Sequence, residues 1–335
     1  MILKIAGEIN QPVPDILAAD IGGTKTNISL CHWNGSSFSF IKEASYKTNG
    51  FDTIESLIET FVTDKELPEK ISLAVAGPVQ NNTVLLTNIN WRIDAKQLES
   101  KFKKPVLLIN DLEAVGYSLA VLNDEDIHVL HSGEKHPCGN AAVIAPGTGL
   151  GEAGLYYDDR GYHPFATEGG HTSFAPQTEI DIELYRYLAR KFEHVSWERV
   201  VSGPGICFIY DFLVQVKERK EPPWIKEKML LNDKAIVISE NINDCAVCKE
   251  TIDTFIRLLA EECGNLALKT KTTGGIFIAG GIVPDLISAI HKEFFLKQFF
   301  NFGRLRNLLQ SVPVHVILNK KSPLIGAAYF AIRRS

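Results

Sequence analysis

The segment ILAADIGGTKTNISL, residues 16–30, decides the fold class. An apolar run ends at Asp20, the pair Gly22-Gly23 follows, and after Lys25 apolar and polar residues alternate again. In Rossmann and Walker loops a helix follows the glycines, and its N-terminus holds a phosphate. Here the chain continues with NISLCHW, the turn NGSS and FSFIKEASY, which is the pattern of strand, turn and strand. The glycines are therefore predicted to lie in a β-hairpin.

A glycine turn of this kind is suited to binding an anion. Glycine tolerates positive φ, and without a Cβ atom the backbone N–H groups and the hydroxyls of Thr24 and Thr26 can approach a phosphate. The alternative is a tight hairpin without a ligand, because short glycine motifs are weak evidence of binding.

A second glycine hairpin follows about 125 residues later. In AAVIAPGTGLGEAGLYY, residues 141–157, an apolar strand leads into Gly147, Thr148 and Gly149, and a second strand follows. This repetition favours two related phosphate-binding turns.

Two more segments rich in glycine or alanine lie toward the C-terminus. In GGIFIAGGIVPDLI, residues 274–287, an apolar strand reaches Gly280-Gly281 before Pro284 opens a helix. In VILNKKSPLIGAAYFAI, residues 316–332, Ser322 and Pro323 mark a helix start, and the small residues after them allow close packing.

The segment KPVLLINDLEAVGYSLAVL, residues 104–122, places polar side chains after a buried strand. The strand is predicted over Val106 to Ile109 and is followed by Asn110, Asp111 and a helix. A carboxylate at the carboxyl end of a strand in an open α/β sheet lies where ligands bind. Asn and Asp are also favoured helix caps, so a purely capping role is the alternative.

Two later segments carry groups suited to an uncharged polyol. TEGGHTSFAP, residues 167–176, supplies Glu168 and His171, and SWERVVSGPG, residues 196–205, supplies Glu198. Carboxylates accept hydrogen bonds from neighbouring hydroxyls, and an imidazole both donates and accepts. The alternatives are a solvated helix residue for Glu198 and a satisfied loop histidine for His171.

Five segments together resemble the bacterial-type glucokinases: INDLEAV, APGTGLG, EGGHTSFAP, WERVVSGPGI and AGGIVP. They occur in order between about residues 16 and 332. The resemblance implies the actin-like ATPase (ribonuclease H-like) fold, an α/β fold of two domains with a cleft between them. It implies a small α/β domain of residues 14–121 plus 313–335 and a large α+β domain of residues 122–312.

The resemblance also implies an activity and a set of roles. The protein is expected to transfer a phosphoryl group from Mg·ATP to the 6-hydroxyl of D-glucose, with Asp111 as the general base and Asp20 holding Mg²⁺ through water. The implied sugar ligands are Asn110, Asp111, Glu168, His171 and Glu198. The implied nucleotide-binding residues are Asp20, Gly22, Gly23, Thr24, Thr26, Gly147, Thr148, Gly149, Gly280 and Gly281. A homodimer is expected as well.

Composition excludes several other classes. The chain has 335 residues and a formal net charge of −5, which argues against general binding to nucleic acids or membrane surfaces, because both are anionic. The segment before Glu8 is too short for a signal peptide, and no apolar run reaches the ~18 residues of a membrane helix. The six cysteines are scattered, which favours reduced thiols and a cytoplasmic location.

Three interpretations stay open beside the glucokinase one. Cys245 and Cys248 have the spacing of a metal or redox pair, but no second pair or nearby histidine completes four ligands. A sugar kinase or sugar-responsive regulator of the repressor–kinase group is a second possibility. A non-catalytic, nucleotide-switched binding protein on the same fold is the third.

Overall fold

The computed structural model describes residues 1–9, 13–62, 67–86, 89–134 and 139–334. It divides into two compact units. Unit 1 comprises Met1–His128, Ala153–Ala166 and Asn319–Ser335, and unit 2 comprises Val129–Glu152 and Thr167–Leu318.

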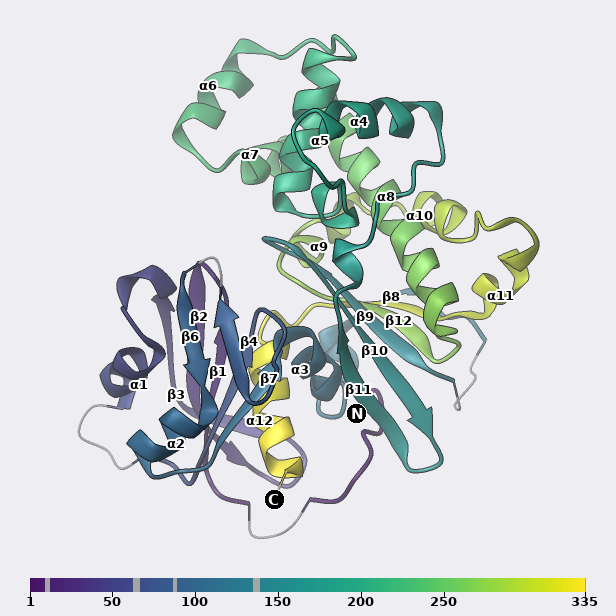
Figure 1. Cartoon of the computed structure of the whole chain (residues 1–335). Helices are drawn as coiled ribbons and strands as arrows, with labels where there is room; N and C mark the ends of the chain where they lie inside the picture. Colours follow the sequence, from purple (N-terminus) through teal and green to yellow (C-terminus); the bar gives the residue numbers. More distant parts are fainter. Residues whose placement is uncertain (10–12, 63–66, 87–88, 135–138, 335) are drawn as a thin grey trace. The chain divides into compact units, whose positions relative to one another are not determined.

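The first sheet has the strand order β3-β2-β1-β4-β7 (Figure 1). Strand β1 pairs antiparallel with β2, where Ile21 lies opposite Thr26, and it pairs parallel with β4, where Ile21 lies beside Val75. The hairpin predicted at Gly22-Gly23 is thereby confirmed. The strands are β1 (Ile16–Ile21), β2 (Lys25–Trp33), β3 (Phe38–Lys47), β4 (Lys70–Val75) and β7 (Val106–Asn110).

The second sheet has the order β11-β10-β9-β12-β13-β8. Its first five strands repeat the order of the first sheet, so the predicted duplication is confirmed at the level of topology. The strand pairs β9–β12 and β12–β13 are parallel. The strands are β8 (Ile127–His131), β9 (Ala141–Pro146), β10 (Leu150–Asp158), β11 (Gly161–Thr167), β12 (Gly275–Ile278) and β13 (Val314–Ile317).

Alternation along the strands of the first sheet assigns its two faces. Ile71, Leu73 and Val75 of β4 point to one face, where they share a core with the buried stripe of α1 (Ile54–Val62) and with α2 (Ala95–Phe102). Ser72 points to the other face and donates to the carbonyl of Ala327. That carbonyl belongs to α12 (Ser322–Arg333), which packs with α3 (Asp111–Ser118).

Unit 1 contains several short elements besides this sheet. They are the hairpin β5 (Thr83–Leu86) and β6 (Trp91–Asp94), with the 3₁₀ turns η1 (Thr48–Gly50) and η2 (Asp124–Asp126).

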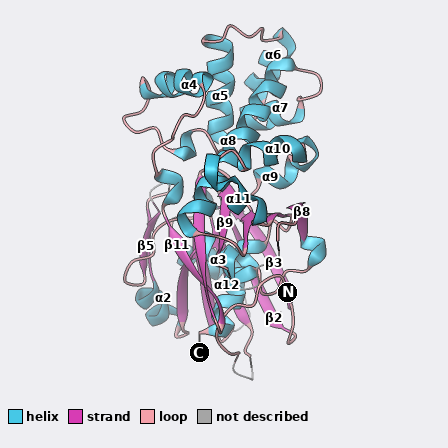
Figure 2. Cartoon of the chain, turned by 90° about the vertical axis from the view of Figure 1, so that its right-hand side faces the viewer, coloured by secondary structure: helices cyan, strands magenta, loops and turns pink. Residues whose placement is uncertain are grey.

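Unit 2 is largely helical between β11 and β12, and Figure 2 shows α4 to α8 grouped together. The helices of this unit are α4 (Glu179–Ala189), α5 (Gly203–Gln215), α6 (Pro223–Leu231), α7 (Lys234–Glu240), α8 (Ala246–Thr270), α9 (Ile282–Asp285), α10 (Lys292–Phe299) and α11 (Arg306–Ser311). Its 3₁₀ turns are η3 (Gly169–His171), η4 (Trp197–Arg199), η5 (Ile287–Ala289) and η6 (Gly303–Leu305). Among the described residues, none of the helices is long and apolar enough to cross a bilayer.

Helix α8 corrects one sequence expectation. The sequence pattern predicts its start at Thr251, but it begins at Ala246 with Cys245 as its N-cap residue. The intervening residues include no helix breaker, and Val247 and Cys248 are buried, so core packing extends the helix toward its N-terminus.

The cysteines within the described ranges are free thiols, and Cys138 lies outside those ranges. Cys245 and Cys248 are both buried. Burial and the neighbouring Cys245 both raise the pKa of the Cys248 thiol, so Cys248 packs as a neutral thiol.

Gly326 permits the close approach of α12 to α3. A Cβ atom at this position would overlap the carbonyl group of Ala114. We expect Gly326→Ala to destabilise the protein by about 1–3 kcal/mol despite its better helix propensity, because backbone atoms cannot move aside cheaply. Urea unfolding measures the change. Gly50→Ala is the matched control, because a Cβ atom there meets nothing within 4 Å and the change should stay within about 0.5 kcal/mol. Equal effects of the two changes would show that α12 can move away from α3 at little cost in stability.

Candidate functional site

The predicted site residues fall into two groups, one in each unit, and each group is described by itself. Unit 1 holds Asp20, Gly22, Gly23, Thr24, Thr26, Asn110 and Asp111, and unit 2 holds Gly147, Thr148, Gly149, Glu168, His171, Glu198, Gly280 and Gly281.

A hydroxyl network fixes the first glycine turn. The N–H of Gly22 donates to the carbonyl of Lys25 at 3.0 Å. Thr48 Oγ1 donates to the carbonyl of Gly22 at 2.8 Å and lies 3.0 Å from Thr26 Oγ1. Thr26 is buried, whereas Thr24 is exposed. Sequence reasoning missed Thr48, because a single threonine after a strand carries no signal of this contact.

Three glycines of the two hairpin turns do not have the positive φ that the sequence argument expected. Gly22, Gly147 and Gly149 all lie outside the left-handed region. A Cβ atom at Gly22 would lie 3.1 Å from the carbonyl oxygen of Lys25, and one at Gly149 would overlap the carboxylate of Glu198. At these two positions close approach is the reason for glycine.

Asp20 lies at the end of β1, beside the first turn. Asn27 Nδ2 donates to its Oδ2 at 3.4 Å. Burial raises the pKa of Asp20 to about 6, and the Asn27 hydrogen bond and the Lys25 charge oppose that rise. A carboxylate with few protein partners is a hard oxygen donor of the kind Mg²⁺ accepts.

The parallel ladder aligns the first turn with the other predicted residues of unit 1. Ile21 of β1 lies beside Val75 of β4, and Val75 lies beside Asn110 of β7. Adjacent strands are about 4.8 Å apart, so the first turn and Asp111 emerge from the same edge of the sheet.

Asn110 is the N-cap of α3. Its Oδ1 accepts from the N–H groups of Leu112 at 3.0 Å and Glu113 at 3.2 Å. Its Nδ2 donates to the carbonyl of Gly77 at 3.2 Å. Asp111, the first residue of the helix, accepts from the N–H of Leu112 at 2.9 Å. Because Asn110 already caps the helix, Asp111 is not required for that role.

In unit 2, the second glycine turn joins β9 to β10. The N–H of Gly147 donates to the carbonyl of Gly149 at 2.8 Å, and the N–H of Gly203 donates to the carbonyl of Gly147 at 2.9 Å. The N–H of Leu150 donates to Glu198 Oε2 at 3.0 Å. One later segment, residues 198–203, therefore holds this turn at two points.

His171 lies between two carboxylates. Its Nδ1 is 3.9 Å from Glu168 Oε2, and its Nε2 is 3.9 Å from Glu198 Oε1. The side chains of Glu168 and His171 are 61% and 63% exposed, whereas Glu198 is 22% exposed, so the cluster is open to a ligand on the Glu168 side. The structure thus brings together the three polar groups predicted from two separate segments.

Backbone pairing produces this cluster. The N–H of Trp197 donates to the carbonyl of Thr172 at 3.0 Å, and the N–H of Phe174 donates to the carbonyl of Val195 at 2.9 Å. The rings of Phe174 and Trp197 pack edge to face at 5.0 Å. These contacts bring η3, which contains His171, next to η4, which contains Glu198.

Gly280 is the predicted site residue whose backbone needs glycine. Its φ is +89°, and a Cβ atom there would overlap the carbonyl of Pro146 at the end of β9. The N–H of Ala279 donates to the carbonyl of Ile144 at 2.8 Å. The parallel pairing of β12 with β9 therefore places Gly280 at the edge of the sheet that carries the second turn. A Cβ atom at Gly281 would meet nothing within 4 Å.

A buried pair of acids lies beneath the Glu168 turn, and sequence reasoning missed it. Glu152 is 2% exposed and Glu262 is fully buried. Asn265 and Lys269 both donate to Glu262, at 2.8 and 3.2 Å. Burial and, to a smaller extent, the Glu262 charge raise the pKa of Glu152 to about 8, so Glu262 carries the charge and Glu152 the proton. The sequence does contain one sign of this pair, because Glu152 is a single acidic residue within the apolar strand around 150–157.

Glu152 supports the turn by contact. A Cβ atom at Gly169 would overlap Glu152 Oε2, and Thr167 Oγ1 donates to the Glu152 carbonyl at 2.9 Å. Glu152 Oε1 has no hydrogen-bond partner among the described residues.

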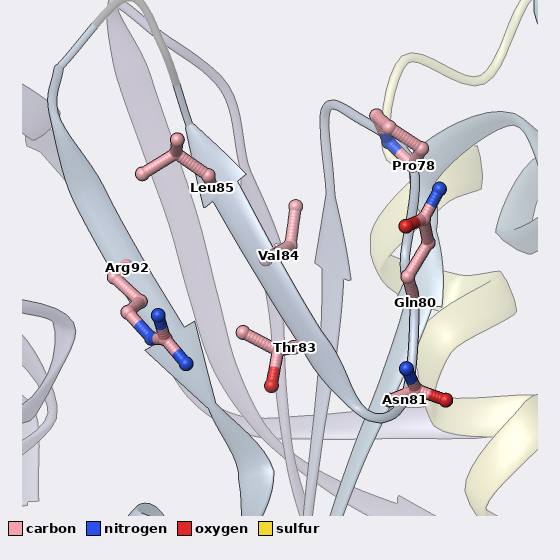
Figure 3. Close-up of a pocket in the computed structure, with 7 residues that line it drawn as sticks. All are labelled: Pro78, Gln80, Asn81, Thr83, Val84, Leu85 and Arg92. Carbon is pink, nitrogen blue, oxygen red and sulfur yellow. The ribbon is translucent and has the colours of Figure 1, made fainter.

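A separate pocket of about 430 Å³ lies on the β5–β6 hairpin (Figure 3). Its lining includes none of the predicted site residues. It begins at Pro78, directly after Gly77, whose carbonyl accepts from Asn110. The pocket is lined by Pro78, Gln80, Asn81, Thr83, Val84, Leu85 and Arg92.

Comparison with known proteins gives consistent results. The family model described as Glucokinase matches residues 17–334. A glucokinase of Nostoc sp. is 39% identical over 338 residues, covering 95% of this chain and 99% of that protein. A crystal structure of a glucokinase from an Antarctic psychrotroph has a TM-score of 0.80 at 30% identity, covering 96% of this chain and 99% of that one. A ROK family glucokinase from Streptomyces griseus, in complex with glucose and AMPPNP, shares the fold with a TM-score of 0.65 at 19% identity, covering 94% of this chain and 98% of that one.

The two sheets of equal strand order and these likenesses define the class: a sugar kinase of the actin-like ATPase fold. Within this class the chain belongs to the glucokinase family, and its activity is that of an ATP-dependent glucokinase, a phosphotransferase. The predicted fold class and activity are therefore confirmed.

The buried acid pair generates a prediction about pH. The pKa of Glu152 is near 4.5 in the unfolded chain and about 8 in the folded protein. Between these values the folded state holds a proton that the unfolded state lacks, so wild-type stability falls as the pH rises. Gln keeps the shape and the donor toward Glu262 without titrating. We therefore expect the stability of Glu152→Gln relative to wild type to increase by up to about 1 kcal/mol per pH unit between pH 5.5 and 8.

Urea unfolding at several pH values measures this difference. Glu193→Gln, a change at an exposed acid, is the control and should show a difference from wild type that does not vary with pH. A pH-independent difference for Glu152→Gln as well would mean that Glu152 is ionised in the folded protein throughout this range.

Proposed function

We propose that this glucokinase transfers the γ-phosphoryl group of Mg·ATP to the 6-hydroxyl of D-glucose, giving glucose 6-phosphate and ADP, with Asp111 as the general base. The observation that carries the sugar assignment is the cluster in which His171 lies 3.9 Å from both Glu168 and Glu198. Two acceptors and an imidazole converge there on one exposed point, which suits the neighbouring hydroxyls of a hexose. The glucose complexes of a Balamuthia mandrillaris and a Streptomyces griseus glucokinase support glucose as the sugar.

Asn110 contributes to sugar binding through its remaining donor. Its Oδ1 accepts two backbone hydrogen bonds and one N–H is donated to Gly77, so its second N–H is the group that it offers to a hydroxyl. Glu168, His171 and Glu198 supply the other contacts. Because Asn110 is fixed by its cap, it positions the neighbouring Asp111 as well.

Asp111 performs the proton transfer. Its carboxylate accepts the proton of the 6-hydroxyl as the sugar oxygen forms a bond to the γ-phosphorus and the bond to the bridging oxygen of ADP breaks. The proton then passes to solvent. Before that step the carboxylate orients the sugar oxygen toward the phosphorus, and positioning is the main requirement of phosphoryl transfer.

Mg²⁺ fits the donors present in unit 1. Within the described residues no three acidic, histidine or cysteine side chains form a cage for a metal ion. A single carboxylate at Asp20 suits an ion that keeps most of its water and takes its other ligands from phosphates. When bound, the ion would neutralise charge on the ATP phosphates. The role of Asp20 is to hold it through water.

The nucleotide is held by the two turns and by the Gly280-Gly281 pair. Thr24 is exposed and offers its hydroxyl directly, whereas buried Thr26 acts through Thr48 by fixing the shape of the first turn. Gly147, Thr148 and Gly149 supply the second turn. The other nucleotide-binding residues are Gly22, Gly23 and the pair Gly280-Gly281. This pair forms the adenosine site.

Two further proposals concern the protein in the cell. A homodimer is supported by the exposed apolar side chains of Leu230, Leu231 and Ile236, which are 79%, 84% and 54% exposed. A cytoplasmic location is supported by the free thiols of the described cysteines.

Asp111→Asn tests the mechanism. Asn keeps the volume and one hydrogen bond but cannot accept the proton, so we expect kcat to fall by about 10²- to 10⁴-fold while glucose affinity changes much less. Glucose-dependent ADP release by wild type and variant measures kcat. If kcat stays within a few-fold of wild type, the base lies elsewhere. If glucose binding is lost entirely, Asp111 is chiefly a sugar ligand.

Glu168→Gln tests the sugar cluster. The change keeps the shape of the side chain but weakens the acceptor, so we expect the KM for glucose to rise by roughly 10- to 100-fold, from about 1.5–3 kcal/mol of lost hydrogen bonding. The KM for ATP should stay nearly constant. Steady-state kinetics with each substrate varied in turn separates the two effects. An equal rise in both KM values would contradict the placement of Glu168 at the sugar.

A further inference from the structure

The carboxylate of Glu198 contacts two different parts of the site. Its Oε2 accepts from the N–H of Leu150, at the end of the second glycine turn, at 3.0 Å. Its Oε1 faces His171 Nε2 at 3.9 Å. One side chain thus joins the turn proposed for phosphate to the cluster proposed for sugar.

Steric contact shows the same connection independently of the hydrogen bond. A Cβ atom at Gly149 would overlap Glu198 Oε2 and lie 3.2 Å from its Cδ. At Gly147, in the same turn, a Cβ atom would meet nothing within 4 Å. Of these two glycines, Gly149 is therefore the one at which a side chain would collide with the Glu198 carboxylate.

The backbone of Glu198 is held against the turn as well. Ser202 Oγ donates to the Glu198 carbonyl at 2.7 Å, and the N–H of Gly203 donates to the carbonyl of Gly147 at 2.9 Å. Ser202 also caps α5 by accepting from the N–H of Gly205 at 3.1 Å. These bonds fix the backbone of Glu198 at η4 next to the second glycine turn.

We propose that Glu198 is a positioning residue for the second phosphate turn as well as a sugar ligand, so that the shape of this turn sets the affinity for glucose even without a nucleotide. The proposal rests on the assignment of Glu198 to the sugar under the proposed function. It adds that a residue of the phosphate turn, Gly149, controls the sugar site through the Glu198 carboxylate.

The physical reason is preorganisation. A hydrogen bond from a backbone N–H to a carboxylate is charge-assisted and fixes the rotamer of Glu198 before the sugar arrives. The entropy of ordering a long side chain then does not oppose sugar binding. By linkage, a sugar hydroxyl that donates to Oε1 also stabilises the bonded arrangement of the turn, so the coupling acts in both directions.

Gly149→Ala tests the proposal in the absence of nucleotide without altering the side chains of the sugar cluster, Glu168, His171 and Glu198. Neither Gly149 nor Gly147 has a positive φ, so alanine is compatible with the backbone at both positions. Calorimetric titration with glucose in the absence of nucleotide should show about tenfold or weaker affinity for Gly149→Ala, and affinity within about twofold of wild type for Gly147→Ala. Circular dichroism checks that each variant is folded.

A double-mutant cycle shows whether the effect passes through Glu198. In a Glu198→Ala background the carboxylate that the new methyl group would meet is gone, so Gly149→Ala should not weaken glucose binding further. Wild-type affinity of the single variant overturns the inference and leaves the proposed function intact. Equal weakening in both backgrounds also overturns it. Failure of wild type to bind glucose instead refutes the proposed function.

A reciprocal measurement keeps the proposal testable if Gly149→Ala does not fold. Glu198→Asp shortens the side chain and breaks the bond to Leu150, so the KM for ATP at saturating glucose should rise several-fold. Glu168→Asp is the matched control, because Glu168 belongs to the sugar cluster but, among the described residues, its side chain accepts no hydrogen bond from the second turn; its KM for ATP should be that of wild type. An unchanged KM for ATP in Glu198→Asp contradicts the inference.

Discussion

The parallel register of the first sheet is the constraint on which the candidate site of unit 1 depends. Ile21, Val75 and Asn110 lie side by side on β1, β4 and β7. Asp20 and the first turn therefore emerge at the same edge as Asp111. A shift of one residue would turn the buried side chains of β4 to the wrong face, so the hydrophobic core fixes this register. Packing of apolar residues thus fixes where the polar groups at this edge of the sheet lie.

In the second sheet a parallel register also places the site residues at one edge, and the backbone conformation of one of them allows only glycine. Ile144 of β9 pairs in register with Ile278 of β12, so the second turn and Gly280 follow at one edge. The carbonyl of Pro146 leaves no room for a side chain at Gly280, whose φ of +89° requires glycine in any case. Repetition of the strand order gives both sheets a glycine turn after the central strand.

Local patterns were sufficient to predict the two hairpins and the strand before Asp111, because each depends on alternation and on turn residues close in sequence. The start of α8 at Ala246 was not predictable in the same way, because core packing decided it. Contacts between residues far apart in the sequence could not be predicted from local patterns either. The bond from Thr48 to Gly22 and the acid pair of Glu152 with Glu262 depend on tertiary structure. The cap made by Asn110 is local, and the capping role that the sequence left open is found there.

The acidic residues at the candidate site of unit 2 differ in solvation, and their roles follow from this difference. Glu152 and Glu262 are buried, so they share a single negative charge and support the backbone of the turn above them. Glu168 and His171 are exposed and 3.9 Å apart, a separation at which a solvated ion pair contributes little stability. Their arrangement is held by the backbone pairing of η3 with η4 rather than by their mutual attraction. Because little energy ties these side chains to each other, a sugar hydroxyl can replace their contact at small cost.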